Sequence, residues 1–166
     1  MGFYQIRNEQ VVESNIENLW RFVSDPSNLK ELTPSKLGFK IMTSTNTEMT
    51  EGMIISYRIK PLLNINAKWV TEISHVKKHE YFIDKQVYGP YKLWHHQHVF
   101  QVIDEHHVRM TDIVTYALPF GLIGDFINFI FIRKKLKTIF DYRQVALNKI
   151  FHKWFVFLKE NPSTKN

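Results

Sequence analysis

Five polar side chains interrupt an otherwise apolar strand face between residues 82 and 121, in the segment FIDKQVYGPYKLWHHQHVFQVIDEHHVRMTDIVTYALPFG. They are Asp84, Gln86, His96, His98 and Asp112. Each alternates with large apolar residues, and side chains two apart along a strand share a face. An imidazole oriented by a carboxylate can move a proton as a general acid or base, or can bond the polar end of a ligand. These residues therefore form the candidate chemical centre of the chain.

The turns between the strands determine how these residues meet. A turn at residues 104–106 places His98 opposite Asp112, and the preceding turn places Asp84 opposite or diagonal to His96. A register shift by two residues keeps the same faces and leaves each pair within reach, directly or through one water. A buried polar group without a partner costs about 1–3 kcal/mol. The pattern therefore predicts a mutually bonded His–Asp network.

Such a network admits three roles, which the sequence leaves open. It can join neighbouring strands, it can orient the polar end of a ligand, or it can catalyse. In a catalytic role, His96 or His98, oriented by Asp84 or Asp112, would be the acid or base of a cyclase or dehydratase. No Ser or Cys stands in a recognisable nucleophile elbow, which argues against a hydrolase.

Metal binding is a further use of two histidines on one face. With Asp84 or Asp112, the His96-x-His98 pair has the residue types of a metal site with an open position. Two histidines at this spacing arise readily by chance in a chain with eight of them. We therefore predict no metal and no cofactor.

Composition sets the outer limits. The chain has 166 residues, of which 44% are hydrophobic and 14% aromatic, which suits one domain over residues 1–160 with a flexible polar tail at 161–166. It has no cysteine, which excludes disulfides and Cys-based zinc sites and suits the cytoplasm. The longest uncharged apolar run, residues 126–132, is far shorter than the ~20 residues that span a bilayer, so we predict no transmembrane segment.

The net charge of +6 permits weak attraction to nucleic acid or to anionic lipid. Exposed positions lack the interleaved arginines and aromatics that stack on bases, so we predict no nucleic-acid partner. The densest basic cluster, residues 133–137, reads first as a solvated helix face.

Periodicity predicts an α+β fold. Residues 3–13 alternate as a first strand, and Ser14 with Glu17 forms a capping box before a short helix, followed by a second at residues 28–33. Six more strands are predicted at 39–45, 53–60, 65–77, 81–88, 93–103 and 108–118, and one long helix after residue 121. Only one long helix is available to cover about seven strands, so the curved antiparallel sheet wraps around it and leaves part of its concave face open as a cavity.

Several motifs carry a family resemblance: Gly89-Pro90-Tyr91, Trp94-x-His96-x-His98-x-Phe100, Met110-Thr111-Asp112 and Tyr116-x-Leu118-Pro119-Phe120-Gly121. With the order of elements, they resemble the SRPBCC superfamily, which includes START domains, pollen-allergen-like proteins and polyketide cyclase/dehydrase-like proteins. The resemblance extends from Phe3 to about Leu158, and the stretch from Phe82 to Gly124 is similar to a bacterial branch described as ligand-binding. It implies a helix-grip fold with a deep cavity, which different members use to bind lipids or hormones or to cyclise polyketides.

The leading functional expectation is binding or carriage of a hydrophobic small molecule or lipid. The residues expected to line or face the cavity, apart from the His–Asp network, are Tyr57, Trp69, Phe82, Gln86, Trp94, Phe100, Met110, Tyr116, Phe126, Ile130 and Phe140. One alternative is a cyclase/dehydratase-type enzyme. Another is a module that binds a partner or the membrane periphery through the apolar residues 120–132, which alternatively pack under neighbouring loops. The oligomeric state stays open.

Overall fold

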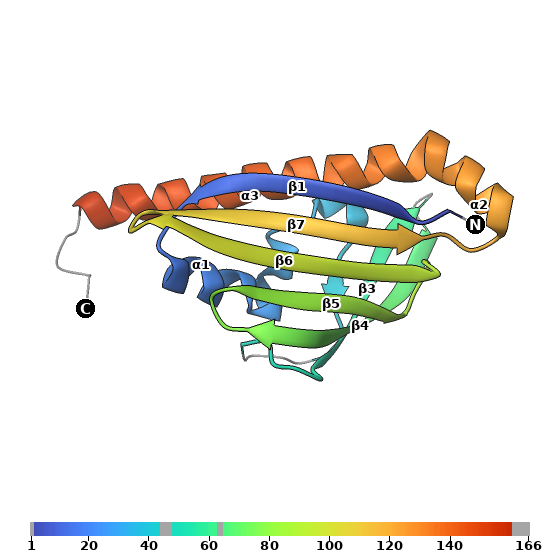
Figure 1. Cartoon of the computed structure of the whole chain (residues 1–166), viewed down its shortest axis with the longest axis horizontal. Helices are drawn as coiled ribbons and strands as arrows, with labels where there is room; N and C mark the ends of the chain where they lie inside the picture. The colour runs from blue at the N-terminus through green and yellow to red at the C-terminus, as the bar shows by residue number, and fades with distance from the viewer. Residues whose placement is uncertain (1, 44–47, 63–64, 161–166) are drawn as a thin grey trace.

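A seven-stranded antiparallel sheet curves around one side of a long C-terminal helix in the computed structural model (Figure 1). The structure describes residues 2–43, 48–62 and 65–160, so the predicted flexible tail lies outside the described residues. The strands are β1 (Tyr4–Glu13), β2 (Lys40–Ile41), β3 (Ile54–Leu62), β4 (Ile65–Lys77), β5 (Tyr81–Tyr88), β6 (Leu93–Asp104) and β7 (His107–Ala117). The helices are α1 (Ile16–Val23), η1 (Pro26–Lys30), η2 (Ser35–Leu37), α2 (Gly121–Ile127), η3 (Asn128–Ile132) and α3 (Arg133–Glu160).

The strand order is β1-β7-β6-β5-β4-β3-β2, so neighbours in sequence pair as hairpins and β1 closes onto β7. This confirms the predicted α+β meander. The predicted ranges 65–77 and 81–88 coincide with β4 and β5. The strand predicted at 39–45 is shorter, with only Lys40–Ile41 paired, while residues 44 and 45 lie outside the described residues.

The start of α1 corrects the predicted capping box. Asn15, not Ser14, is the N-cap, and its side chain accepts a hydrogen bond from the backbone N–H of Asn18 at 2.9 Å. The Ser14 hydroxyl instead donates to the carbonyl of Asn15. Asn is at least as good an N-cap as Ser, and here it stands next to the first helical residue.

The sequence predicts one long C-terminal helix, but the helical run in the structure is interrupted. A five-residue π-helical segment, η3, separates α2 from α3. Such a segment inserts a residue into the helical ladder and turns the side chains on either side of it relative to one another. Among the described residues, no helix is long and apolar enough to cross a membrane.

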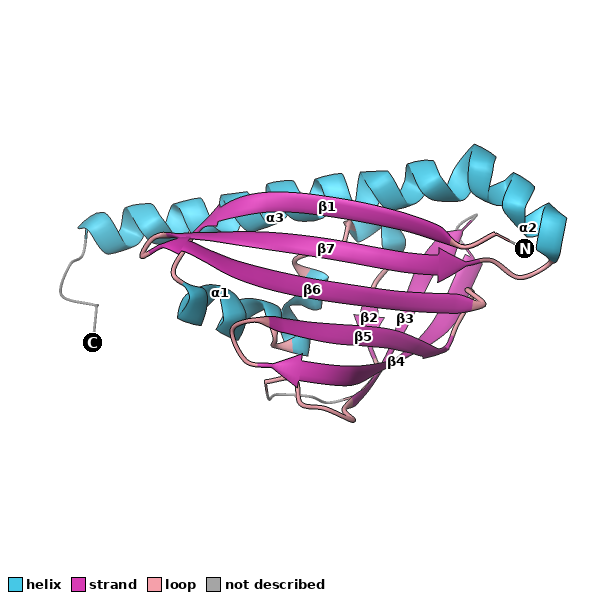
Figure 2. Ribbon diagram, in the orientation of Figure 1, coloured by secondary structure: helices cyan, strands magenta, loops and turns pink. Residues whose placement is uncertain are grey.

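Two clusters of buried side chains lie between the sheet and the helices, which occupy the same side of it (Figure 2). The first gathers Trp20 of α1, Phe100, Met110 and Leu147. The second gathers Trp69, Trp94, Tyr116, Leu136 and Phe140. Together they anchor both halves of α3 to the sheet, as the predicted wrapping requires.

Candidate functional site

Strands β5, β6 and β7 bring the polar residues together in the predicted register. His98 pairs with Asp112 across β6 and β7, and Asp84 pairs with His96 across β5 and β6. The flanking pairs also match the prediction, with Phe100 opposite Met110 and Trp94 opposite Tyr116. Strand alternation and turn position therefore sufficed to place these residues on one face.

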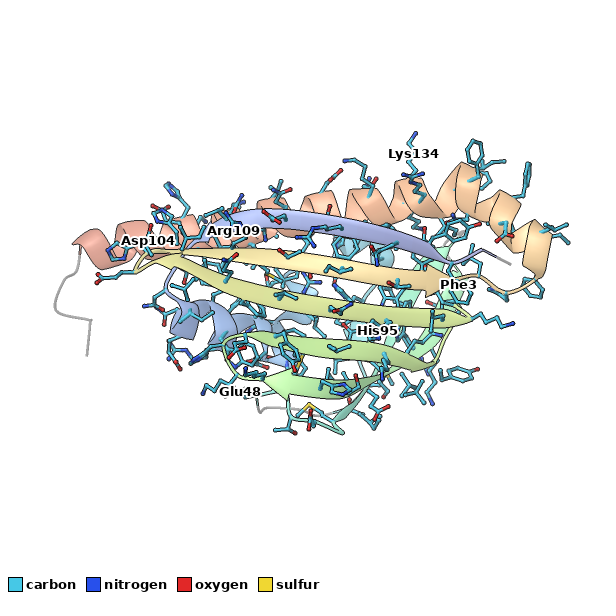
Figure 3. The ribbon with its side chains drawn as sticks, in the orientation of Figure 1. Phe3, Glu48, His95, Asp104, Arg109 and Lys134 are labelled. Carbon is cyan, nitrogen blue, oxygen red and sulfur yellow. The ribbon has the colours of Figure 1, made fainter. Side chains whose placement is uncertain are left out.

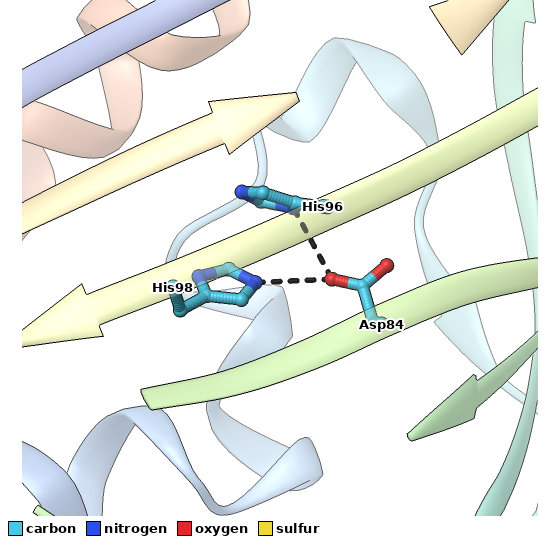
Figure 4. A group of neighbouring side chains, drawn as sticks. All are labelled: Asp84, His96 and His98. Carbon is cyan, nitrogen blue, oxygen red and sulfur yellow. Dashed lines mark hydrogen bonds and ion pairs between the residues drawn. The ribbon is translucent and has the colours of Figure 1, made fainter. Parts of the chain in front are cut away.

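Asp84, His96, His98 and Asp112 form a closed group, which we call the His–Asp cluster. His96 Nε2 lies 3.0 Å from Asp112 Oδ1, and His98 Nε2 lies 3.0 Å from Asp84 Oδ2, both as hydrogen bonds. Crossed contacts complete the group: His96 Nδ1 lies 3.2 Å from Asp84 Oδ2, and His98 Nδ1 lies 2.8 Å from Asp112 Oδ1. One Asp84 oxygen thus serves both imidazoles (Figure 4).

Aromatic rings enclose the cluster. The His96 and His98 rings lie 3.7 Å apart, Phe82 stacks on His98 at 4.1 Å, and Phe140 of α3 meets His96 edge-on at 5.6 Å. Both histidines and Asp112 are buried. Their charges must therefore be balanced by neighbouring groups rather than by bulk water.

Burial and charge act in opposite directions on the carboxylates. Burial raises the pKa of Asp84, but the charge of His96 and the close contacts with both histidines outweigh it and hold that pKa below its usual value. Burial likewise raises the pKa of Asp112, but the Arg143 guanidinium and the two histidines hold it well below normal. Both carboxylates are therefore ionised at neutral pH.

The two histidines differ. Burial lowers the pKa of His98, and the neighbouring charge of His96 lowers it further, beyond what the two carboxylates recover. Burial also lowers the pKa of His96, but Asp84 and Asp112 overcome it and raise that pKa above its usual value. The surroundings therefore favour a proton on His96 over one on His98.

A cavity of about 150 Å³ lies between the sheet, the η1–η2 segment and α3. Its wall includes members of both core clusters, together with Asp84, His96 and His98. From the helical side it is lined by Leu29, Leu32, Leu37, Ile132, Lys135, Leu136, Ile139, Phe140 and Arg143. The cavity is therefore mainly apolar, with the His–Asp cluster on one wall.

The predicted lining residues divide into two sets. Those on the cavity wall are Tyr57, Trp69, Phe82, Trp94 and Phe140. Those away from it are Gln86, Phe100, Met110, Tyr116, Phe126 and Ile130, and Asp112 also stands behind the wall.

Four of the residues away from the cavity wall are held by other contacts. Phe100 and Met110 pack in the first core cluster, where Trp20 of α1 lies 5.5 Å from Phe100 and closes that end of the sheet. Gln86 spans the β5–β6 turn, donating to the Tyr91 carbonyl at 2.6 Å and accepting from its N–H at 3.2 Å. The Tyr116 hydroxyl donates to the side chain of a buried asparagine of η3.

The prediction is wrong for Phe126 and Ile130. Both side chains are exposed to solvent and do not line the cavity. The alternative expectation that residues 120–132 pack under neighbouring loops is wrong for the same reason. Of this stretch, only Ile132 reaches the cavity wall.

Several wall residues were not predicted from the sequence, and the helical ones had a readable signal. Ile132, Leu136, Ile139 and Arg143 recur every three or four residues, which marks one face of a helix. A charged residue on such a face breaks the apolar pattern, so the sequence alone does not single out Arg143.

Three buried polar atoms of cavity residues have no hydrogen-bond partner among the described residues: Trp69 Nε1, His98 Nδ1 and Arg143 Nε. His98 Nδ1 is close to Asp112, but not in line for a hydrogen bond. Unpaired buried donors are rare, and each is a place where a ligand acceptor or water would be stabilised. Two residues that line the cavity, Trp69 and Arg143, therefore each carry an N–H donor without a partner among the described residues.

Asp84, His96 and His98 also each offer one ligand atom within 4.8 Å of one another, which is the grouping a small metal ion needs. Those atoms already contact one another, and the Arg143 guanidinium acts on the same cluster. A dication would have to displace these contacts beside a fixed positive charge.

No protein-family model matches the sequence, and no curated protein matches it. Solved structures do match in shape. A START superfamily protein from Mycobacterium smegmatis aligns over 92% of this chain and 99% of its own, at a TM-score of 0.67 and 10% identity. The chain therefore shares the helix-grip fold of that protein.

Two plant proteins share this helix-grip fold. A major latex-like protein from Panax ginseng aligns over 90% of this chain and 97% of its own, at a TM-score of 0.66 and 10% identity. A norcoclaurine synthase variant from Thalictrum flavum, in complex with a transition-state analogue, aligns over 92% and 97%, at 0.65 and 12% identity. Identities this low support the fold alone, and one of the matching proteins is an enzyme.

Proposed function

We propose that this protein binds a small amphipathic molecule, with an apolar body and one hydrogen-bond acceptor or anionic end, in the cavity between the sheet and α3. The observation that carries the proposal is the cavity itself, a mainly apolar space lined by two residues, Trp69 and Arg143, whose buried N–H donors have no partner among the described residues. Ligand pockets commonly combine apolar walls with a few fixed polar groups. The norcoclaurine synthase complex offers a precedent on the same fold for a bound small molecule.

Cavity size limits the ligand. A cavity of about 150 Å³ matches the size of engineered apolar cavities that bind benzene. Pockets for drug-sized ligands are larger, at about 300–1,000 Å³. The enclosed part of the ligand is therefore one ring or a short acyl chain, and a longer lipid would extend out of the cavity.

The polar residues of the cavity indicate the chemistry of the ligand's polar end. Trp69 and Arg143 have N–H donors to satisfy, and Lys135 adds a second cation to the wall. The two ionised carboxylates of the cluster are already engaged with histidines. A carboxylate or carbonyl oxygen therefore suits the site better than an ammonium group.

A fluorescence titration tests the proposal, because Trp69 and Trp94 both line the cavity. We expect octanoate or phenylacetate to change tryptophan emission saturably. Ile139→Trp places a large ring on the cavity wall and should abolish saturation. Val145→Trp puts the same ring on the exposed side of α3 and should bind like the parent once the emission of the added indole is subtracted. Equal binding by the two variants would contradict cavity binding. So would the absence of binding in both the parent protein and the Val145→Trp control.

A second candidate function is cyclase/dehydratase-type catalysis. The observation that favours it is the pair of adjacent histidines on the cavity wall whose pKa values are displaced in opposite directions. Such a pair separates an acid from a base. Here His96 would be the acid and neutral His98 the base.

His98→Gln separates the two functions. If the protein only binds, the substitution changes affinity or melting temperature. If it catalyses, turnover of a bound carbonyl compound is lost while its affinity is largely kept. The comparison uses any compound that passes the fluorescence titration, with product detected by mass spectrometry.

A further inference from the structure

The α2–η3 segment is built with its polar side against the protein. The Asp125 carboxylate accepts hydrogen bonds from the Gly2 N–H at 2.9 Å and from the Tyr4 hydroxyl at 2.8 Å. Asn128 is buried and accepts from the Tyr116 hydroxyl at 2.7 Å. Gly124 lies so close to the Pro119 carbonyl that a Cβ would come within 2.1 Å of that oxygen. These contacts fix which side of the helix faces inward.

The apolar side consequently faces outward. We call its exposed residues the apolar ridge: Phe120, Leu122, Ile123, Phe126, Phe129 and Phe131. Leu122 is 83% exposed and Phe129 is 84% exposed. A surface helix normally buries its apolar stripe, and large contiguous apolar patches are uncommon on monomers. The ridge therefore calls for a partner that shields it from water.

The charged residues around the ridge are mostly positive. Residues 118–137 contain four bases and one acid, Asp125, whose carboxylate is engaged on the inner side. Arg133 and Lys134 follow the ridge directly, are exposed, and form no salt bridge among the described residues. Figure 3 shows Lys134 projecting away from the sheet.

We propose that the apolar ridge inserts into the interfacial layer of an anionic lipid membrane, with Arg133 and Lys134 against the headgroups. Apolar side chains beside lysine and arginine are the combination that binds such surfaces. A symmetric dimer through the same ridge fits less well, because it would bring the bases of both copies toward one interface, where Asp125, the one acid of residues 118–137, is already engaged on the inner side. The proposal does not depend on what the cavity binds.

The membrane contact would also adjoin the cavity. Ile132 ends the π-helical segment and Lys135 follows one turn later, and both line the cavity. The ridge and the cavity therefore meet at the start of α3.

Vesicle sedimentation tests the proposal with the full chain. We expect binding to vesicles of phosphatidylcholine with 30% phosphatidylglycerol at low salt, at least tenfold weaker binding to pure phosphatidylcholine, and weakening in 0.5 M NaCl as headgroup charges are screened. The double variant Leu122→Ser/Phe129→Ser should bind at least tenfold more weakly. Arg133→Gln/Lys134→Gln should lose the preference for the anionic lipid.

Val145→Ser is the control and should bind like the parent, because Val145 is an exposed apolar residue of α3 that does not belong to the ridge. Circular dichroism and melting curves verify that each variant is folded. Failure of the parent to bind anionic vesicles would overturn the proposal. So would undiminished binding by the ridge variant, or a concentration-dependent dimer of the parent that the ridge substitutions abolish.

Discussion

Replacing Asp112 with Asn tests whether the His–Asp cluster is balanced as a unit. Asp112 is buried, bonds His96 at 3.0 Å and lies 2.8 Å from His98 Nδ1. It also lies in the field of Arg143, which holds its pKa down. Asn keeps the volume and one acceptor oxygen but removes the charge. His96 and Arg143 would then face only one carboxylate.

The expected loss follows from two bounds. Removing one partner of a buried ion pair costs about 3–5 kcal/mol, and a hydrogen bond to a charged group contributes about 1.5–3 kcal/mol. Because Asn retains an acceptor, we expect about 3 kcal/mol of lost unfolding free energy. For a domain of this length, that corresponds to a fall in Tm of roughly 6–12 °C.

Urea unfolding at pH 7, followed by circular dichroism, measures this loss. Asp104→Asn is the matched control, because Asp104 also bonds a histidine, His107 at 2.8 Å, but in an exposed turn where solvent screens the pair. In Asp112→Asn, NMR titration should also show a lower pKa for His96, since Asp112 contributes to raising it. A loss below about 1 kcal/mol, or an equal loss in the Asp104 variant, would refute the idea of a coupled buried cluster.

Three further outcomes follow from the same contacts. The pKa values of both cluster carboxylates are lowered in the folded state, so these groups stay ionised at pH values where the unfolded chain binds protons. The unfolding free energy should therefore fall as pH drops below the usual aspartate pKa of 3.8. Urea titrations at pH 7, 4 and 3 should show a weaker fall in Asp112→Asn than in the parent protein. Gly124→Ala should destabilise by about 1–3 kcal/mol because the added Cβ meets the Pro119 carbonyl, whereas Leu122→Ala at an exposed position should leave the melting temperature unchanged. Adding Zn²⁺ should not raise that temperature, since Arg143 opposes a dication at the cluster; a saturable rise that is absent in Asp84→Asn would contradict this.

Much of the site could be predicted because its determinants are local. Strand side chains alternate with a period of two, and a short turn fixes which residues face each other. The pairing of His98 with Asp112 and of Asp84 with His96 therefore followed from parity and turn position alone. The same parity misassigned Phe100 and Met110 to the cavity. Alternation identifies the face of a strand, but it does not reveal where along that strand another element, here α1 with Trp20, fills the space.

The α2–η3 segment shows the complementary limit. Burial of apolar side chains is the usual rule, so Phe126 and Ile130 were assigned to the interior. Their orientation is determined instead by contacts far apart in sequence, between Asp125 and the N-terminal residues Gly2 and Tyr4. Local periodicity carries no information about such contacts. An inward polar side held by specific hydrogen bonds overrides the hydrophobic pattern there.

On our two proposals, α3 connects the membrane contact with the cavity through a line of positive charge. Arg133 and Lys134 face outward, Lys135 stands on the cavity wall, and Arg143 lies deeper, next to the His–Asp cluster. Arg143 follows Lys135 by eight positions, which is about 12 Å along a helix. An anionic amphipathic ligand entering at the ridge would find a cation at each end of that length, while its apolar body left water. The cluster's carboxylates would not oppose this path, because each is already engaged with both histidines. The charge balance of the cluster therefore affects both the stability of the fold and the preference for an anionic ligand. Asp112→Asn adds net positive charge beside Arg143, so its ligand affinity should be measured as well as its stability.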